Sequence, residues 1–295
     1  MNHGLRLVPL LAAAGLLSSA SPIARAPDPP RGSLVIVGGG DRSEAMMRRF
    51  VELAGGRGAR IAVVPNASSE PEETGRELVA ELDSLGARAF VYHLDRAAAA
   101  LAASARRLDS ATGIWFSGGD QARVTAVLAG TPVQRAMLRR YREGAVVGGT
   151  SAGAAIMSDS MITGNQTPPG DTTGYYGDEY PAIARHRVEI VPGLGFLPEA
   201  IVDQHFIRRE RHNRLLSAVL ERPSLLGVGI DESTALEVGP DGRWRVLGES
   251  AVVIYDARHA HVTGGKKPLL GATGLRVHVL PAGAAFDPRT GGGDL

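Results

Sequence analysis

The sequence predicts an α/β fold with a doubly wound, mostly parallel sheet and additional C-terminal antiparallel strands. Two observations support this prediction. Short runs of apolar and β-branched residues alternate with segments of helical periodicity, and the runs are apolar at successive positions, as in strands buried on both faces. The chain has 295 residues, of which 44% are hydrophobic and 21% charged, and this composition suits one large globular domain.

The first half of the chain shows the alternation most clearly. Because parallel strands need crossover connections, its helices should cover both faces of the sheet. Residues 161–182 are rich in Gly, Thr, Pro and Tyr and lack a period, so a long loop is expected there. Strands are expected at 33–37, 60–65, 88–94, 113–116 and 144–147, and helices near 42–54, 70–86, 120–129 and 132–143.

The second half is expected to contain a helix from Ile207 to Glu221. The runs LLGVGID, ALEV, RWRVLG, AVVIYDA and LRVHVL then predict a section of antiparallel strands. We assign residues 33–285 to a single α/β domain. Residues 286–295, which end in GGGDL, are expected to be a disordered tail.

Residues 1–26 have the pattern of a secretory signal peptide. An apolar run from Leu7 to Leu17 follows the first arginine, and small residues then lead to the sequence A-R-A that ends at Ala26. The alternative is a membrane anchor, but the uncharged stretch is short for a bilayer span, and a Pro-rich linker at 27–32 follows directly. We expect cleavage after Ala26 and a secreted or periplasmic protein with no membrane contact after cleavage.

The net charge and the cysteine count exclude several functions. A formal charge of +1 argues against a general attraction to nucleic acid. The chain has no cysteine, which rules out disulfides, thiolate metal ligands and a cysteine nucleophile. A hydrolytic nucleophile must therefore be another residue type.

Gly149 to Gly153 have the G-x-S-x-G pattern of a nucleophile elbow, with Ser151 at the centre. The small neighbours allow a strand and a helix to approach closely at a strained turn. Ala145 to Val147 supply the entering strand, and AGAAIM predicts the following helix, whose N-terminal amides favour a developing oxyanion. The alternative is a tight strand-to-helix joint without chemistry.

A serine hydroxyl needs a base, which is usually a histidine oriented by a carboxylate. Of the eight histidines, His205 is the best candidate, because in AIVDQHFIRRERHNRL it follows an apolar run at the point where polar residues end a strand. Asp231 and Glu232 end another apolar run in GVGIDEST, so one of them could point into the same crevice.

Two further turns, VGGGDRS and FSGGDQA, follow the first and fourth expected strands. Ligand sites in open α/β sheets lie beyond the carboxyl ends of the strands, so these turns and the serine turn could face one crevice. The first turn lacks the full G-x-G-x-x-G spacing, which argues against a dinucleotide site. His259 and His261 could share one face of a late strand as a metal pair, but no third ligand is evident, and no metal or cofactor is expected.

The motifs GGTSAGAA, FSGGDQ, DQHFIRRERHNRL and GIDEST resemble those of the cyanophycinase branch of the dipeptidase E serine peptidases, in the same order. The likeness spans roughly residues 33–240. It implies a doubly wound fold like that of class I glutamine amidotransferases and cleavage of bonds that follow aspartate. Cyanophycinases release β-aspartyl-arginine dipeptides from the end of cyanophycin, a polyaspartate with arginine linked to each β-carboxylate.

The resemblance implies roles for the residues in these motifs. Ser151 would be the nucleophile, His205 the general base and Glu232 the residue that orients it. Members of the family have also been assigned a carboxylate from the loop between serine and histidine, which here would be Asp171 or Glu179. The oxyanion hole would use the backbone amides of Gly119 and Ala152. The residues that match the family's substrate pocket are Gln121, Asp203, Gln204, Arg209, Arg211 and Arg214.

The arginines of this set also suit a substrate carboxylate on physical grounds. On a helix they could extend one basic face from His205, and guanidinium groups bind carboxylates bidentately. The alternative is a surface helix with solvated arginines paired with Glu210 or Glu221. The substrate's own guanidinium would need acidic or aromatic partners, for which the candidates are Asp203, Tyr175, Tyr176, Asp178 and Glu179.

The sequence thus predicts a secreted serine-type exopeptidase that hydrolyses cyanophycin to β-aspartyl-arginine dipeptides through an acyl-enzyme. The main alternative is an aspartyl dipeptidase with the same mechanism that acts on short Asp-X peptides. A metal-dependent hydrolase and a non-catalytic binder are further alternatives. The resemblance also points to a homodimer, for which the sequence itself shows no interface pattern.

Overall fold

The computed structural model describes Met1 and residues 29–166, 180–263 and 268–295. Nearly all of the expected signal peptide and most of the expected loop at 161–182 lie outside these ranges. Within them, no helix has both the length and the apolar character needed to cross a membrane.

A nine-stranded sheet forms the centre of the fold, in the order β17-β16-β11-β10-β1-β5-β4-β2-β3. The last five strands in this order run parallel, and the others extend the sheet through antiparallel pairs that begin with β10 against β1. The parallel strands are β1 (Leu34–Val37), β2 (Arg60–Val64), β3 (Arg88–Val91), β4 (Gly113–Phe116) and β5 (Val146–Thr150). The antiparallel strands are β10 (Thr234–Val238), β11 (Trp244–Gly248), β16 (Ala285–Asp287) and β17 (Gly292–Asp294).

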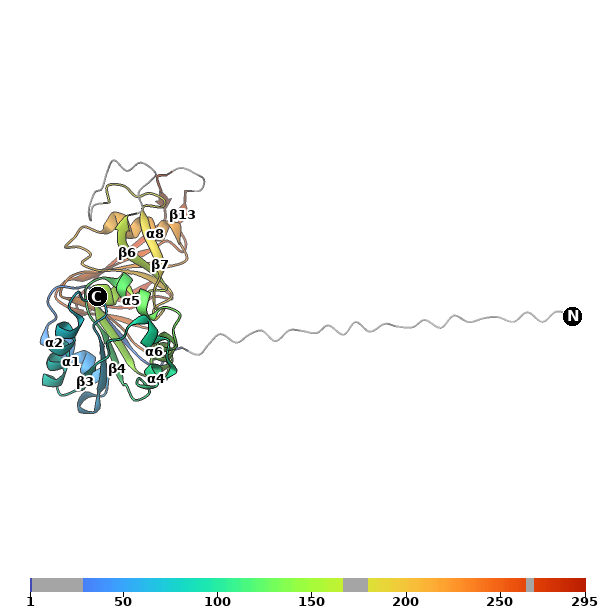
Figure 1. Ribbon diagram of the computed structural model, residues 1–295. Helices are drawn as coiled ribbons and strands as arrows, with labels where there is room; N and C mark the ends of the chain where they lie inside the picture. The colour runs from blue at the N-terminus through green and yellow to red at the C-terminus, as the bar shows by residue number, and fades with distance from the viewer. Residues whose placement is uncertain (2–28, 167–179, 264–267) are drawn as a thin grey trace.

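Helices cover both faces of the parallel strands, so the fold is doubly wound as the sequence predicts (Figure 1). Caps fix several boundaries: Ser43 Oγ accepts the Met46 N–H at the start of α1, and Gly144 ends α6 with φ 118°. One face carries α1 (Glu44–Leu53), the 3₁₀ turn η1 (Gly56–Gly58) and α2 (Pro71–Ser84). The other carries α3 (Arg96–Ala99), α4 (Ala102–Arg106), α5 (Gln121–Leu128) and α6 (Pro132–Glu143).

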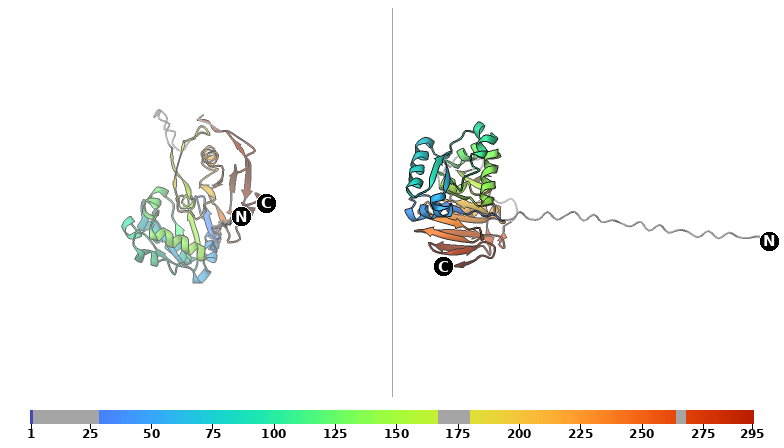
Figure 2. Two further views of the ribbon diagram at one scale, coloured as in Figure 1. Left: turned by 90° about the vertical axis from the view of Figure 1, so that its right-hand side faces the viewer. Right: turned by 90° about the horizontal axis from the view of Figure 1, so that it is seen from below.

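A second sheet contains four strands of the C-terminal half, in the order β15-β12-β9-β8. Only β8 and β9 are parallel in it. Leu215, Ala218 and Val219 of α8 pack on one face of this sheet. The elements are β8 (Ala200–Asp203), α8 (His212–Glu221), β9 (Leu226–Ile230), β12 (Ala251–Asp256) and β15 (Arg276–Pro281). The C-terminal strands lie together on one side of the molecule in Figure 2.

The region after the nucleophile turn differs from the sequence prediction. Residues 160–166 form strand β6 (Ser160–Gln166) instead of the start of a loop, because they pair with the distant β7 (Val188–Pro192). This hairpin lies beside α8 at the upper end of the molecule in Figure 1. A second short hairpin joins β13 (His261–Val262) and β14 (Ala272–Thr273).

The expected disordered tail also differs, because residues 286–295 contain most of β16 and all of β17. The two strands pair with each other, and β16 pairs with β11. The Phe286 side chain is fully buried, with its ring centroid 5.8 Å from that of Trp244. This buried aromatic residue explains why the glycine-rich end is held in the sheet.

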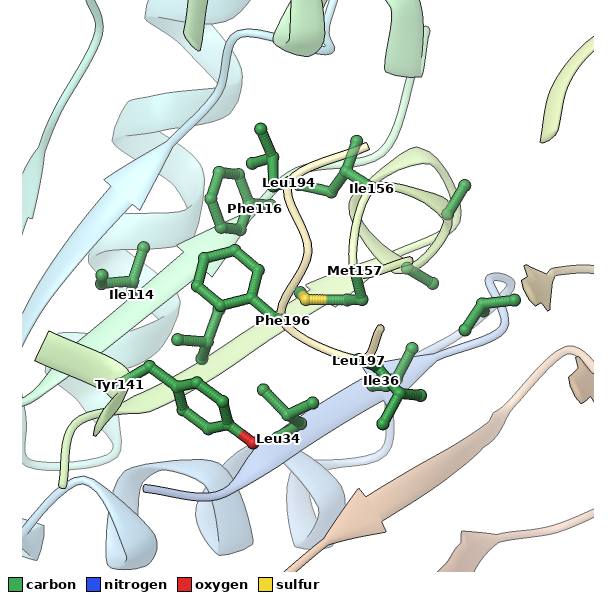
Figure 3. Close-up of a cluster of buried hydrophobic side chains, with 14 of the residues drawn as sticks. Leu34, Ile36, Ile114, Phe116, Tyr141, Ile156, Met157, Leu194, Phe196 and Leu197 are labelled. Atoms are coloured by element: carbon green, nitrogen blue, oxygen red, sulfur yellow. The ribbon is translucent and has the colours of Figure 1, made fainter. Parts of the chain in front are cut away.

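The largest cluster of buried apolar side chains lies against β1, β4 and β5 (Figure 3). Phe196 packs against two other aromatic rings of this cluster, and its ring centroid lies 6.2 Å from that of Phe116 and 5.8 Å from that of Tyr141. Ile156 and Met157, which follow the nucleophile turn, pack into the same cluster. The core therefore fixes the turn that carries Ser151 against the sheet.

Candidate active site

Ser151 lies at a strained turn between β5 and the short helix α7 (Ala152–Ala155). Its φ of 53° and ψ of −107° belong to a region that residues with a side chain rarely adopt. Close packing requires glycine on both sides of the serine. A Cβ added to Gly149 would lie 2.7 Å from the backbone oxygen of Gly153, and a Cβ added to Gly153 would lie 2.6 Å from the backbone oxygen of Phe116. The G-x-S-x-G pattern therefore forms an elbow. The helix that follows has only four residues, shorter than the run AGAAIM predicts.

Three side chains form one hydrogen-bonded chain at this elbow. Ser151 Oγ lies 2.8 Å from His205 Nε2, and His205 Nδ1 lies 2.7 Å from Glu232 Oε1. They follow β5, β8 and β9, so they meet at carboxyl ends of strands. A carboxylate at Nδ1 favours the tautomer with its proton there, which leaves Nε2 free to accept the serine proton. The arrangement is that of a nucleophile, a general base and an orienting carboxylate.

The glycine turn after β1 supports the imidazole. The Gly38 carbonyl accepts the His205 N–H at 2.7 Å. Gly39 has φ 112°, and an added Cβ there would lie 2.2 Å from His205 Cε1, so only glycine fits against the ring. The sequence predicts that this turn faces the crevice but not that it supports the histidine. The sequence signal that could have indicated this support is the run of three glycines directly after a buried strand.

The FSGGDQ turn after β4 borders the nucleophile. An added Cβ at Gly118 would lie 3.7 Å from Ser151 Cβ. Gly119 has φ 131° and packs against the Ala67 carbonyl, since an added Cβ would lie 2.1 Å from that oxygen. Ala152 directly follows the serine. These positions are compatible with an oxyanion hole formed by the amides of Gly119 and Ala152.

The environment of His205 favours its neutral form. Burial lowers the pKa of the imidazole below its ordinary value of 6.5, and the charges of Arg209 and Arg211 lower it further. The hydrogen bond and the charge of Glu232 raise this pKa but do not offset the decrease. Neutral imidazole, which can accept a proton, therefore persists to lower pH than it would in a solvated histidine.

We expect the acid limb of kcat/KM to have its midpoint below pH 6.5. His205 must be neutral to act as a base, so activity is lost only as the pH falls through its lowered pKa. In Arg209→Gln the limb should move to higher pH, because one charge that disfavours the imidazolium is gone.

Arg208→Gln is the matched control, since this exposed neighbour is not among the charges that shift the pKa of His205. Initial rates across the acid range test this, and a limb above pH 6.5, or one that both variants move equally, would contradict it.

Four residues matched to the substrate pocket form a buried network next to His205. Arg214 is 1% exposed; its Nε donates to Asp203 Oδ2 at 2.9 Å, and its Nη2 also donates to Asp203. Arg211 Nη1 donates to the Gln204 carbonyl at 2.8 Å and to the Gln204 side-chain oxygen.

The prediction that the arginines lie on one basic helix face is wrong, because residues 207–211 form turns and α8 begins only at His212. Two of the three arginines are therefore buried and not solvated.

The other two matched residues differ in exposure. Gln121 is buried, and its Nε2 donates to the carbonyls of Ile162 and Thr163 at 3.0 and 2.6 Å, which ties α5 to β6. Arg209 is exposed, and its N–H donates to the His205 carbonyl at 3.0 Å. The remaining candidates lie outside the described residues; these are Asp171, Tyr175, Tyr176, Asp178 and Glu179.

The histidine pair considered as a metal site does not form a strand face. His261 begins β13, whereas His259 lies in the preceding turn. In the part of the chain that the structure describes, no group of three or more His, Cys, Asp or Glu side chains is arranged to hold a metal ion.

A serine on a nucleophile elbow at the carboxyl end of β5 is joined to a histidine and a glutamate that follow β8 and β9 of the second sheet, and this arrangement defines a serine hydrolase. Residues 34–243 match the sequence model of peptidase family S51. The chain belongs to this family and is a serine-type peptidase.

Curated relatives are similar to the chain over most of its length. The chain is 38% identical over 272 residues to a cyanophycinase from Synechococcus elongatus, covering 88% of this chain and 80% of the relative. It is 35% identical over 274 residues to a cyanophycinase from Trichormus variabilis, covering 89% and 87%. A solved peptidase from an acI-B1 actinobacterium shares the fold, with a TM-score of 0.63, 22% identity and coverage of 88% and 98%. These comparisons confirm the resemblance that the sequence motifs indicate.

Proposed function

We propose that the protein is a secreted serine-type exopeptidase that hydrolyses cyanophycin to β-aspartyl-arginine dipeptides. The observation that carries the proposal is the Ser151–His205–Glu232 chain in a family S51 peptidase that is 38% identical to a cyanophycinase over 88% of its length. The proposed chemistry is acyl transfer and needs no cofactor.

In the proposed mechanism, Ser151 attacks an aspartyl carbonyl of the polymer backbone while His205 Nε2 accepts the serine proton. The amides of Gly119 and Ala152 then stabilise the oxyanion, a kind of interaction whose loss typically costs 10²- to 10³-fold in kcat. The imidazolium, stabilised by Glu232, protonates the leaving amine. Water activated by the same histidine hydrolyses the aspartyl ester and restores the serine.

Substrate recognition in this proposal uses the exposed face of the site. The substrate offers a carboxylate, and Arg209 is the exposed one of the three arginines that match the substrate pocket. A guanidinium fork binds such a group more strongly than a neutral donor does. The buried arginines are supported as positioning groups by their pairing with Asp203 and Gln204.

The experiment that tests the proposal is incubation of purified protein with cyanophycin, followed by mass analysis of the soluble products. We expect β-aspartyl-arginine as the main product at early times, because an exopeptidase removes one unit at a time. Short Asp-X peptides, assayed in parallel, should be cleaved much more slowly per enzyme. Faster cleavage of the short peptides would favour an aspartyl dipeptidase and overturn the polymer assignment.

The export part of the proposal rests on the N-terminal sequence, with its apolar run from Leu7 to Leu17 and the small residues before Ala26. Expression of the full chain in a bacterial host, followed by fractionation and N-terminal sequencing, tests it. The exported protein should begin at Pro27. A chain that stays in the cytoplasm with its first residues intact would contradict this part alone.

A further inference from the structure

Asp231 has a buried carboxylate that the proposed mechanism does not use. It is 8% exposed and precedes Glu232, the carboxylate that contacts the imidazole. Its Oδ1 accepts the backbone N–H of Ile207 at 3.1 Å and that of Arg208 at 2.9 Å. Its Oδ2 accepts the Ser250 hydroxyl at 2.8 Å. Asp231 therefore holds the backbone that directly follows the general base.

The backbone at this point needs such support. His205 has φ 49°, in the left-handed region that a residue with a β-carbon rarely adopts. A strained backbone of this kind persists only where its surroundings fix it. The Gly38 carbonyl restrains the N–H of His205, and the Asp231 carboxylate restrains the two amides after Phe206. The strained residue is thus fixed on both sides.

Asp231 and Glu232, the two adjacent residues that follow β9, contact different parts of the histidine and its turn. Glu232 contacts the ring at Nδ1, and Asp231 contacts the backbone that carries the ring. Phe206, which lies between, is fully buried and donates its N–H to the Ile230 carbonyl at 3.2 Å. The turn is therefore attached to the end of β9 at several points, and Asp231 supplies the side-chain part of that attachment.

We propose that Asp231 is a positioning residue for the general base: its carboxylate fixes the turn after His205 so that Nε2 stays within hydrogen-bond distance of Ser151 Oγ. The inference rests on the proposed triad but not on the proposed substrate. Its contribution is geometric. A displacement of about 1 Å in a catalytic group costs on the order of 10²-fold in rate.

The test uses a phosphonofluoridate, which reacts with an activated serine whatever the natural substrate. In Asp231→Ala the second-order rate of labelling, followed by intact mass, should fall by about 10²-fold. Asp231→Asn should restore most of it, because Oδ1 still accepts the two amides and Nδ2 can donate to Ser250. Asp231→Glu keeps the charge but moves the acceptor by one methylene, so it should react more slowly than Asp231→Asn. With substrate, the loss should appear in kcat and not in KM.

The order of the last two variants separates geometry from charge, and it stays informative if Asp231→Ala does not fold. Asp241→Ala is the matched control: this exposed aspartate also accepts a backbone N–H, from Arg243 at 3.0 Å, but lies in another turn. It should react at the wild-type rate. A folded Asp231→Ala that reacts at the wild-type rate, or an Asp231→Glu faster than Asp231→Asn, overturns the inference.

The same assay distinguishes this inference from the proposed function. Ser151→Ala should not be labelled, and labelling at the wild-type rate in that variant would overturn both the triad and the role of Asp231. If labelling behaves as expected but cyanophycin is not cleaved, the substrate assignment fails while the positioning role stands.

Discussion

Replacement of Ser151 by alanine should lower kcat on cyanophycin by about 10⁵- to 10⁶-fold, because the variant has no nucleophile to form the acyl-enzyme. The remaining groups can still bind substrate and stabilise an oxyanion, so KM should change little and a small rate above water should persist. Release of soluble dipeptide over long incubations, quantified by mass, measures the residual rate. The matched control is Ser84→Ala, an exposed serine on α2, which should keep full activity.

The carboxylate of the triad is tested in the same assay. Glu232→Gln keeps the shape of the side chain but cannot stabilise the imidazolium, and it should cost about 10⁴-fold. Asp171→Asn and Glu179→Gln should have a much smaller effect, since the Glu232 carboxylate already occupies His205 Nδ1. Full activity in Ser151→Ala would refute the nucleophile assignment. A larger loss in Asp171→Asn or Glu179→Gln than in Glu232→Gln would move the orienting role to that loop.

Ser151 and His205 could be selected from the sequence because each follows an apolar run, whereas the strand pattern left Asp231 and Glu232 open and the family resemblance selected Glu232. Apolar runs lead into all three residues of the triad; in the structure these runs are β5 of the nine-stranded sheet and β8 and β9 of the four-stranded sheet, and the carboxyl ends of the three strands meet at the site. The glycines on both sides of the serine are a second signal in the sequence, because the close packing at these positions leaves no space for a Cβ. The choice of Glu232 over the loop carboxylates required the structure, because the sequence does not give the distance between a carboxylate and His205 Nδ1.

The environment of the arginines could not be predicted in the same way. A helix from Ile207 would have placed them on a basic surface face, whereas the positive φ of His205 starts a series of turns. The direction of a side chain after such a turn depends on its non-local partners, such as Asp203 for Arg214. The sequence motif fixes which residues are near the base but not whether they face the substrate or the interior.

Elements that depend on distant pairing were also the ones missed in the fold. The parallel strands and their helices carry local signals, from apolar runs and from caps such as Ser43. In contrast, β6 is a strand because it pairs with β7, and β17 because it pairs with β16. The second half of β6, Gly-Asn-Gln, and all of β17, Gly-Gly-Asp, carry little strand propensity, so local patterns predict a loop and a disordered tail.

The Asp203–Arg214 pair should control stability more strongly than any exposed ion pair. Both side chains are 1% exposed and joined by two hydrogen bonds. Burial alone would lower the pKa of the Arg214 guanidinium, but the Asp203 carboxylate outweighs burial and the pKa is raised, so the arginine stays charged. Arg214→Met leaves the carboxylate buried without its partner and should lower the free energy of unfolding by about 3–5 kcal/mol. Denaturant titration followed by circular dichroism measures this loss.

Two comparisons decide whether the loss comes from an uncompensated buried charge. The double variant Asp203→Leu with Arg214→Met removes both charges and should recover much of the lost stability, because a buried pair replaced by apolar groups is often neutral. Arg243→Ala breaks an exposed pair, 2.8 Å from Asp294 with side chains 41% and 82% exposed, and should cost less than about 1 kcal/mol. An Arg214→Met protein as stable as Arg243→Ala, with a raised KM, would instead assign Arg214 to substrate binding. That result would contradict the positioning role of this network.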